Sequence, residues 1–305
     1  GGRNLVVCID GTSNQFSKTR NTNVVELYSR LVKNEHQLTF YNSGIGTYAQ
    51  PSWKSLGYYK QVLMNKLDLA FALRFEKIIL SAYAWLADHY QEGDRIFLFG
   101  FSRGAYQVRA LSAMIETVGL IHKGNGDQIP FDNDDSDNDD NDDDAAPGTI
   151  HERFKHAFSR DVKVHFVGAW DTVSSVGIAR NKTLPGTTDG MTHVCFFRHA
   201  LALHERRVKF LPEYARGGCA DDPATDDEAG TTPRTSPHTK EVWFVGCHGD
   251  MQFGPALRWM SFEALLAGVE LLPAPPKWER QPTKTNSMTP FWRFVDLLPI
   301  KRLSY

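Results

Sequence analysis

The stretch from Arg95 to Ala105 constrains the fold of this chain most, because it combines a strand, a sharp turn and a helix start. Ile96 to Phe99 is a short apolar run, the pattern of a strand that is buried on both faces. Residues 100–104 follow as G-x-S-x-G, and apolar side chains then recur at helical spacing as far as Val118. The stretch therefore predicts a strand, an elbow and a helix, with Ser102 at the elbow.

Ser102 is a candidate nucleophile because of this context. In such a unit the two glycines allow a tight turn, the serine hydroxyl projects above the edge of the sheet, and the helix N-terminus supplies positive potential. The pentapeptide alone is a weak signal, since it arises by chance in roughly one chain in ten of this length. The alternative is that Ser102 only caps the helix of an ordinary strand-to-helix turn.

Strands and helices alternate along the rest of the chain. This order predicts an α/β fold, with a mostly parallel central sheet and helices on both faces. The whole chain, residues 1–305, is expected to form a single domain. The other predicted strands are 4–9, 37–42, 162–170 and 241–246, the last of which is expected to be a core strand. The other predicted helices are 24–32, two within 60–90, 199–207 and 258–272.

The composition limits the classes of function. The net charge of −2 argues against a nucleic-acid partner. The four cysteines have no C-x-x-C spacing, so no metal, cofactor or redox pair is expected, and a reducing compartment is the simpler inference. No signal peptide is visible, and the densest apolar run, residues 78–87, is too short to span a bilayer. A cytoplasmic protein is expected.

Two segments depart from this globular pattern. Residues 132–146 are nearly pure aspartate and asparagine and predict a disordered acidic insertion. They lack the glycine and the later glutamate that a calcium-binding EF-hand loop needs. The tail from residue 273 is rich in proline, and its residues 295–300 are a candidate edge strand.

Polar residues follow three of the predicted strands, and chemistry in parallel sheets is placed at the carboxyl ends of strands. They are Ser102, Asp171 and His248, in the order that α/β-hydrolases use. Such a serine needs an imidazole to take its proton and a carboxylate to orient the imidazole. His199 is the second choice for the base, and Asp250 is the rival acid, whose other role would be to bind backbone N–H groups of its own loop.

Donors for an oxyanion are predicted beside the serine. The N–H of Arg103 is one, and the loop after the first strand offers Gly11 and Thr12 as the second, unless that loop is only a glycine turn capped by an aspartate. Asp10 in the same loop is a candidate substrate contact.

The segment 48–59 is unusually aromatic for a loop. Its Trp53 and Tyr58 either pack in the core or meet a substrate or a lipid interface.

Six motifs in order carry a resemblance to a known family. The motifs are residues 8–14, 41–47, 100–105, 167–173, 199–207 and 242–250. On these motifs the chain is similar to the α/β-hydrolase domain shared by bacterial type VI secretion phospholipase effectors and uncharacterised fungal proteins, and most similar to the fungal branch. The similarity runs from Leu5 to about Leu272.

This resemblance implies a serine lipase or phospholipase, with Ser102, Asp171 and His248 in the three catalytic roles. Its partner would be a lipid or another ester substrate, and peripheral contact with a membrane surface would fit. Two departures from the family pattern are the lack of a glycine run after Asp250 and the presence of His204 where an aspartate is expected. The alternatives are a catalytically silent scaffold that acts as a binding module, and a small-molecule esterase or thioesterase.

Overall fold

The computed structural model describes residues 2–11, 21–44, 58–125, 150–173, 187, 190–207, 210, 212–215, 238–250, 254–273 and 286–288. For residues 58–72, 150 and 151 it describes the backbone only. Several predictions of the sequence therefore lie outside the described residues: those for Thr12, Trp53, the side chain of Tyr58, the acidic insertion at 132–146, residues 251–253 and most of the tail from 273.

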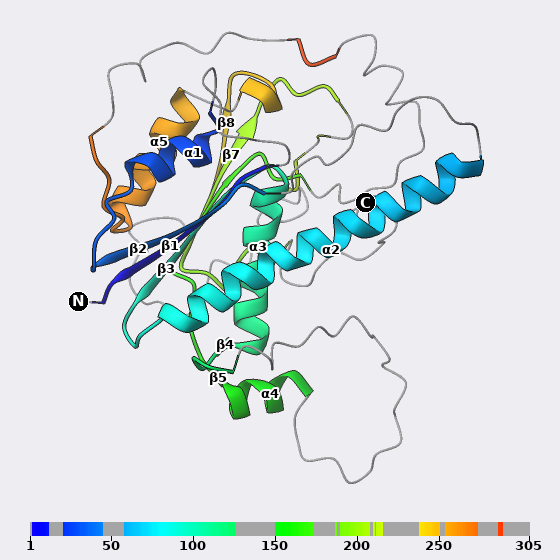
Figure 1. Cartoon of the computed structure of the whole chain (residues 1–305). Helices are drawn as coiled ribbons and strands as arrows, with labels where there is room; N and C mark the ends of the chain where they lie inside the picture. Colours follow the sequence, from blue (N-terminus) through cyan, green and yellow to red (C-terminus); the bar gives the residue numbers. More distant parts are fainter. Residues whose placement is uncertain are drawn as a thin grey trace, which may run out of the picture.

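Six parallel strands form the central sheet, so the prediction of a mostly parallel sheet is confirmed (Figure 1). Their order across the sheet is β2-β1-β3-β6-β7-β8. The strands are β1 (Asn4–Ile9), β2 (Gln37–Asn42), β3 (Arg95–Phe101), β6 (Phe166–Trp170), β7 (Phe196–Ala202) and β8 (Thr239–Phe244). A separate antiparallel pair consists of β4 (Leu120–Ile121) and β5 (Ser159–Arg160).

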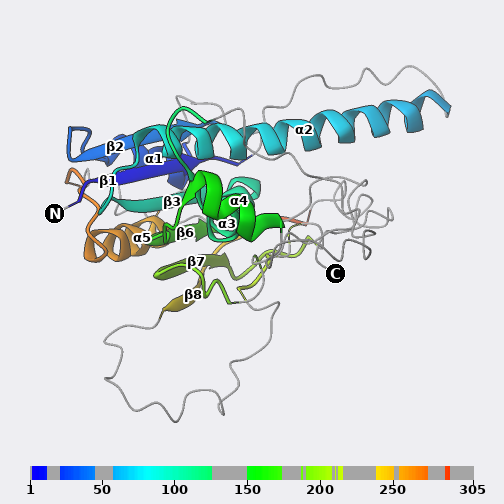
Figure 2. The same ribbon diagram turned by 90° about the horizontal axis from the view of Figure 1, so that it is seen from below.

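Helices cover both faces of the sheet, as predicted (Figures 1 and 2). Helices α1 and α5 lie on one face, and α2 and α3 lie on the other. Each face has its own cluster of buried apolar side chains, because the central strands are buried on both sides. The helices are α1 (Asn23–Arg30), α2 (Tyr58–His89), α3 (Arg103–Val118), α4 (Ile150–Phe158), α5 (Pro255–Leu266) and the 3-10 turn η4 (His248–Asp250).

The start of α1 shows how local sequence sets an element. Thr22 occupies the N-cap, and its hydroxyl accepts a hydrogen bond from the Val25 N–H. The same hydroxyl donates to the Asp10 carboxylate at 2.6 Å. The cap therefore ties the first helix to the loop that follows β1.

Three predictions about elements are wrong. The two helices expected within 60–90 are one helix, α2, since no glycine or proline interrupts residues 58–89. The helix expected at 199–207 is instead the end of β7 and a turn, because pairing with β6 and β8 overrides the helix-forming composition of this run. Among the described strands, β8 lies at the edge of the sheet and is half-buried, whereas a core strand was expected at 241–246.

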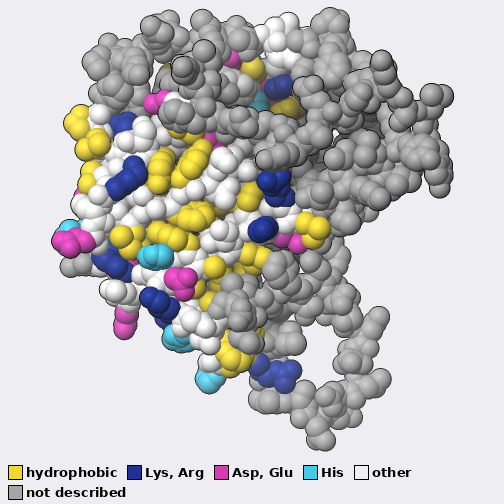
Figure 3. Space-filling view, viewed as in Figure 1, with side chains coloured by type: hydrophobic (Ala, Val, Ile, Leu, Met, Phe, Trp, Pro, Cys, Tyr) yellow, Lys and Arg dark blue, Asp and Glu magenta, His cyan; other side chains and the backbone are white. Residues whose placement is uncertain are grey.

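The described surface is of mixed character. On the face seen in Figure 3, basic and acidic side chains are interspersed among apolar ones over the described residues. Among the described helices, none is both long and apolar enough to cross a membrane.

Candidate active site

Ser102 lies at the junction of β3 and α3, in a strained backbone conformation. Its φ of 57° falls in the left-handed region that side chains with a Cβ seldom adopt. The glycines of the motif allow the close packing around it: a Cβ on Gly100 would lie 2.4 Å from the carbonyl oxygen of Gly104. Ser102 occupies the N-cap position of α3, but its hydroxyl makes no capping hydrogen bond.

Strand β6 holds the elbow from the next position in the sheet. The Ser102 N–H donates to the Trp170 carbonyl at 2.9 Å, and the Val173 N–H donates to the Ser102 carbonyl at 3.2 Å. These two partners flank Asp171, which is fully buried and has a positive φ of 46°. The adjacent strands therefore hold the serine and the aspartate in one backbone frame.

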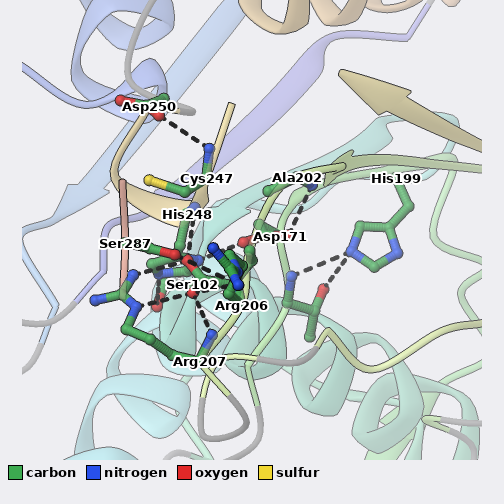
Figure 4. A network of polar contacts seen from close by, with 12 residues as sticks. Ser102, Asp171, His199, Ala202, Arg206, Arg207, Cys247, His248, Asp250 and Ser287 are labelled. Carbon is green, nitrogen blue, oxygen red and sulfur yellow. Dashed lines mark hydrogen bonds and ion pairs between the residues drawn. The ribbon is translucent and has the colours of Figure 1, made fainter. Parts of the chain in front are cut away.

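The side chain of Asp171 is held on both oxygens. Oδ1 accepts a hydrogen bond from the Ala202 N–H at 3.0 Å, and Oδ2 accepts one from Nδ1 of His248 at 2.5 Å (Figure 4). A carboxylate partner requires the proton on Nδ1, which leaves Nε2 as the acceptor for the Ser102 hydroxyl at 2.9 Å. The structure thus brings Ser102, His248 and Asp171 together. Their exposed fractions are 6%, 6% and 0%, so the cluster is almost completely shielded from solvent.

Aromatic rings enclose the imidazole. The ring of Phe101 stacks on His248 at a centroid distance of 4.9 Å and an interplanar angle of 23°. The ring of Phe210 contacts His248 at 5.0 Å, and the Arg207 guanidinium lies 3.9 Å from the Phe210 ring centroid. These contacts limit rotation of the imidazole away from the serine.

Glu205 fixes the backbone of the histidine. Its carboxylate is only 1% exposed, and Oε2 accepts the His248 N–H at 3.0 Å. Oε1 accepts the N–H groups of Arg206 and Arg207, and both oxygens bind the Arg207 guanidinium. Burial raises the pKa of Glu205, but the hydrogen bonds from Arg207 and His248 outweigh it and lower the pKa to about 2. The Glu205 carboxylate is therefore charged at neutral pH.

The two rival residues of the sequence analysis have other partners. His199 contacts Glu241 and Thr172, as described below. Asp250 accepts the Cys247 N–H at 2.9 Å, which is the loop-holding role considered for it. His204, at the position where an aspartate was expected, accepts the Gly246 N–H at 3.2 Å.

The loop after β1 lies against the elbow. A Cβ on Gly104 would lie 2.5 Å from the carbonyl oxygen of Asp10, so this loop touches the first turn of α3. The Gly11 N–H donates to Asp10 Oδ1 at 2.7 Å, and the Tyr41 hydroxyl donates to Oδ2 at 3.1 Å. The Asp10 carboxylate thus has structural partners in its own loop and on β2, in keeping with the alternative of a capped glycine turn.

Arg103, the residue after the serine, starts α3. Burial lowers the pKa of its side chain to about 10. Its backbone N–H belongs to the first turn of the helix, where N–H groups have no acceptor within the helix. This position suits a donor aimed at an oxygen near Ser102.

Over the part of the chain that the structure describes, no group of three or more His, Cys, Asp or Glu side chains is arranged to hold a metal ion. Of the cysteines in that part, Cys8 and Cys247 are buried, Cys195 is partly buried, and all three are free.

The sequence analysis missed the roles of Glu205, Phe101 and Phe210. Phe101 is the first of the two variable residues within G-x-S-x-G, and Glu205 lies in one of the six motifs, but the sequence around neither position indicates its partner. Their roles depend on contacts with His248 across long stretches of the chain, since Glu205 lies 43 residues before it and Phe101 lies on strand β3.

Comparison with known proteins places the chain in a family. A curated relative, the uncharacterised protein YEL023C of Saccharomyces cerevisiae, is 37% identical over 223 residues, which are 68% of this chain and 32% of the yeast protein. The chain therefore spans about a third of the length of that relative. A crystal structure of an uncharacterised protein from Pseudomonas aeruginosa aligns with 96% of this chain and 48% of that one, at 17% identity and a TM-score of 0.46.

The family model described as "T6SS, Phospholipase effector Tle1-like, catalytic domain" matches residues 3–262. The match includes every described residue of the Ser102, His248 and Asp171 cluster and all six strands of the sheet. This confirms the resemblance seen in the sequence: the chain belongs to the family of Tle1-like phospholipase effector catalytic domains.

Proposed function

We propose that the chain is a serine hydrolase that cleaves carboxylic ester bonds of lipid-like substrates, phospholipids included. One observation carries the proposal: the buried hydrogen-bonded chain from Ser102 Oγ through the His248 ring to Asp171, with distances of 2.9 and 2.5 Å. Membership of a phospholipase effector family supports the lipid-like substrate.

The chemistry proceeds in two stages. Ser102 Oγ attacks the acyl carbon while its proton passes to His248 Nε2, and a tetrahedral intermediate forms. The intermediate collapses as His248 returns this proton to the departing alcohol oxygen, which leaves an acyl group on Ser102. A water molecule then attacks the acyl carbon and gives a proton to His248, the carboxylic acid departs, and the proton returns to Ser102. Asp171 holds the Nδ1–H tautomer and stabilises the transient imidazolium.

The negative oxygen of the intermediate needs donors. In the proposal the Arg103 N–H is the first, and the loop of Gly11 and Thr12 supplies the second. Contact of the Asp10 carbonyl with Gly104 supports the position of this loop beside the serine. Because the Gly11 N–H donates to Asp10, a donor from Gly11 would require that bond to break first. Asp10, Trp53 and Tyr58 remain proposed as substrate contacts.

The silent scaffold is the second candidate, and it predicts a serine without a base in reach. The 2.9 Å separation of Ser102 Oγ and His248 Nε2 favours the hydrolase. A small-molecule esterase or thioesterase would use the same residues and differ only in the acyl donor.

The decisive experiment is covalent labelling with a fluorophosphonate probe. Labelling is expected in the wild type and in Cys247→Ala, and its loss is expected in Ser102→Ala. An unlabelled wild type would refute the enzymatic proposal. Comparing hydrolysis of phospholipid vesicles with hydrolysis of a soluble short-chain ester then separates a lipase from a small-molecule esterase: a rate confined to the soluble ester would refute the lipid substrate.

A further inference from the structure

A second histidine–carboxylate pair lies next to Asp171, the proposed acid. His199 is fully buried on β7, and its Nδ1 lies 2.9 Å from Oε1 of Glu241 on β8. Its Nε2 lies 3.1 Å from the backbone nitrogen of Thr172 (Figure 4). Thr172 directly follows Asp171, so the pair lies one residue away from the carboxylate that contacts His248.

The contacts determine the protonation of His199. A backbone N–H can only donate, so Nε2 must accept from Thr172, and the proton lies on Nδ1, directed at Glu241. Burial lowers the pKa of His199, which favours the neutral ring that these contacts require. Among the charged groups around the ring, Glu241 and Asp171 favour the protonated form and Arg109 opposes it.

Glu241 closes a ring of hydrogen bonds around Thr172. Its Oε1 also accepts the Ala215 N–H at 2.9 Å. Two residues earlier in the chain, the Glu213 N–H donates to the Thr172 carbonyl at 2.9 Å. Both backbone groups of Thr172 are thereby fixed, one by His199 and the other by the segment that Glu241 holds.

This matters for Asp171 because the Thr172 N–H belongs to the peptide group that joins the two residues. The orientation of that peptide plane sets ψ of Asp171, while its φ of 46° is in the left-handed region. A residue that is not glycine keeps such a conformation only where its surroundings hold it. The bond from Thr172 to His199 acts on the backbone that aims the Asp171 carboxylate.

We propose that His199, oriented by Glu241, is a positioning residue that holds the Asp171–Thr172 peptide and so aims the Asp171 carboxylate at His248. This inference rests on the proposed hydrolase function. His199 does not contact Ser102 or His248 in the described structure, so its effect passes through the backbone.

Two substitutions of His199 separate its hydrogen bond with the Thr172 N–H from its hydrogen bond with Glu241. His199→Asn places an amide N–H near the position of Nδ1, keeps the donor to Glu241 and is too short to reach Thr172. His199→Gln places an amide oxygen near the position of Nε2, accepts from Thr172 and loses the bond to Glu241. His165→Asn is the matched control, since the His165 ring contacts the Ala267 carbonyl and precedes the amino end of β6.

The rate on a soluble p-nitrophenyl ester is measured per active site, counted by fluorophosphonate labelling. In His199→Asn we expect kcat to fall about tenfold, since the carboxylate no longer orients the base. We also expect the acid limb of the kcat/KM profile to move about one pH unit lower, because an imidazole that loses a carboxylate partner holds its proton less tightly. In His199→Gln and in the control, kcat stays within about threefold of wild type and the limb does not move.

A role in stability alone would lower the fraction of folded enzyme without moving the acid limb. Equal kcat losses in the Asn and Gln variants, or an unmoved limb in His199→Asn, would therefore overturn the inference. If circular dichroism shows that His199→Asn does not fold, Glu241→Ala makes the same test by another route. Without the Glu241 carboxylate the proton of His199 is no longer held on Nδ1, and a ring with its proton on Nε2 cannot accept from Thr172, whereas the amide oxygen of His199→Gln needs no such partner. A lowered limb in Glu241→Ala supports the inference, and an unmoved limb overturns it. Absence of labelling in the wild type would instead refute the proposed function.

Discussion

The buried carboxylate of Glu205 joins the loops that follow β7 and β8, and its removal is the sharpest test of how His248, the proposed base, is held in place. Glu205→Gln keeps the shape of the side chain and removes its charge. The amide has a single acceptor oxygen, so it cannot replace both carboxylate oxygens. If that oxygen takes the place of Oε2, which accepts from the His248 N–H and the Arg207 guanidinium, an NH2 group faces the donors that Oε1 accepts from, the N–H groups of Arg206 and Arg207. The variant is therefore expected to lose stability and catalytic rate together.

The magnitude follows from the pKa of Glu205. It is lowered from an ordinary value of 4.5 to about 2, a difference that corresponds to roughly 3 kcal/mol. Since the folded-state pKa is the lower one, this contribution is complete above about pH 5 and is lost as the pH falls from 4.5 through 2. About 2 kcal/mol of it is expected to be gone by pH 3.

Urea unfolding of the wild type and of Glu205→Gln at pH 7 and pH 3 measures this difference. The wild type should exceed the variant by roughly 3 kcal/mol at pH 7, and the gap should narrow at pH 3. Glu35→Gln is the matched control, because the Glu35 side chain is 86% exposed, and it should change stability by less than about 0.5 kcal/mol. A gap that does not change with pH would refute the reasoning.

Three further predictions concern the surroundings of the site. Gly104→Ala should cost about 1–3 kcal/mol in thermal unfolding and lower kcat, because its Cβ would lie 2.3 Å from the Ile9 carbonyl oxygen; an unchanged Tm would count against this packing. Thr22→Ala should cost about 1–2 kcal/mol in urea unfolding, since it removes the α1 cap and a hydrogen bond to Asp10, and a loss below about 0.3 kcal/mol would contradict it. Burial raises the pKa of the Cys8 thiol, so a disulfide reagent should modify Cys8 only in unfolded protein, and rapid modification of the folded protein would disprove the burial.

Much of the architecture could be predicted from the sequence because its strongest signals are local. The apolar runs of β1 and β2 match the predicted strands at 4–9 and 37–42. Polar residues directly after three such runs also predicted which side chains would meet, since the carboxyl ends of parallel strands share one edge of the sheet.

The remaining features depend on contacts between distant segments. The composition of residues 199–207 favours a helix, and only pairing of β7 with two neighbours makes its first part a strand. That error placed His199 on a helix. On strand β7 His199 instead pairs in register with Glu241 of β8, and the hydrogen bond between the two side chains follows from this pairing. The hydrogen bond between the Glu205 carboxylate and the His248 N–H likewise joins residues 43 positions apart, so no local sequence pattern predicts it.

The position of β8 at the margin of the sheet has a consequence for inactivation. The proposed nucleophile and acid follow strands that have neighbours on both sides, whereas the proposed base follows a strand with one neighbour among the described strands. Peripheral strands open locally at a lower free energy than the interior of a sheet. On mild heating the imidazole should therefore separate from its partners while the rest of the protein keeps its shape, and esterase activity should disappear before the circular dichroism signal does.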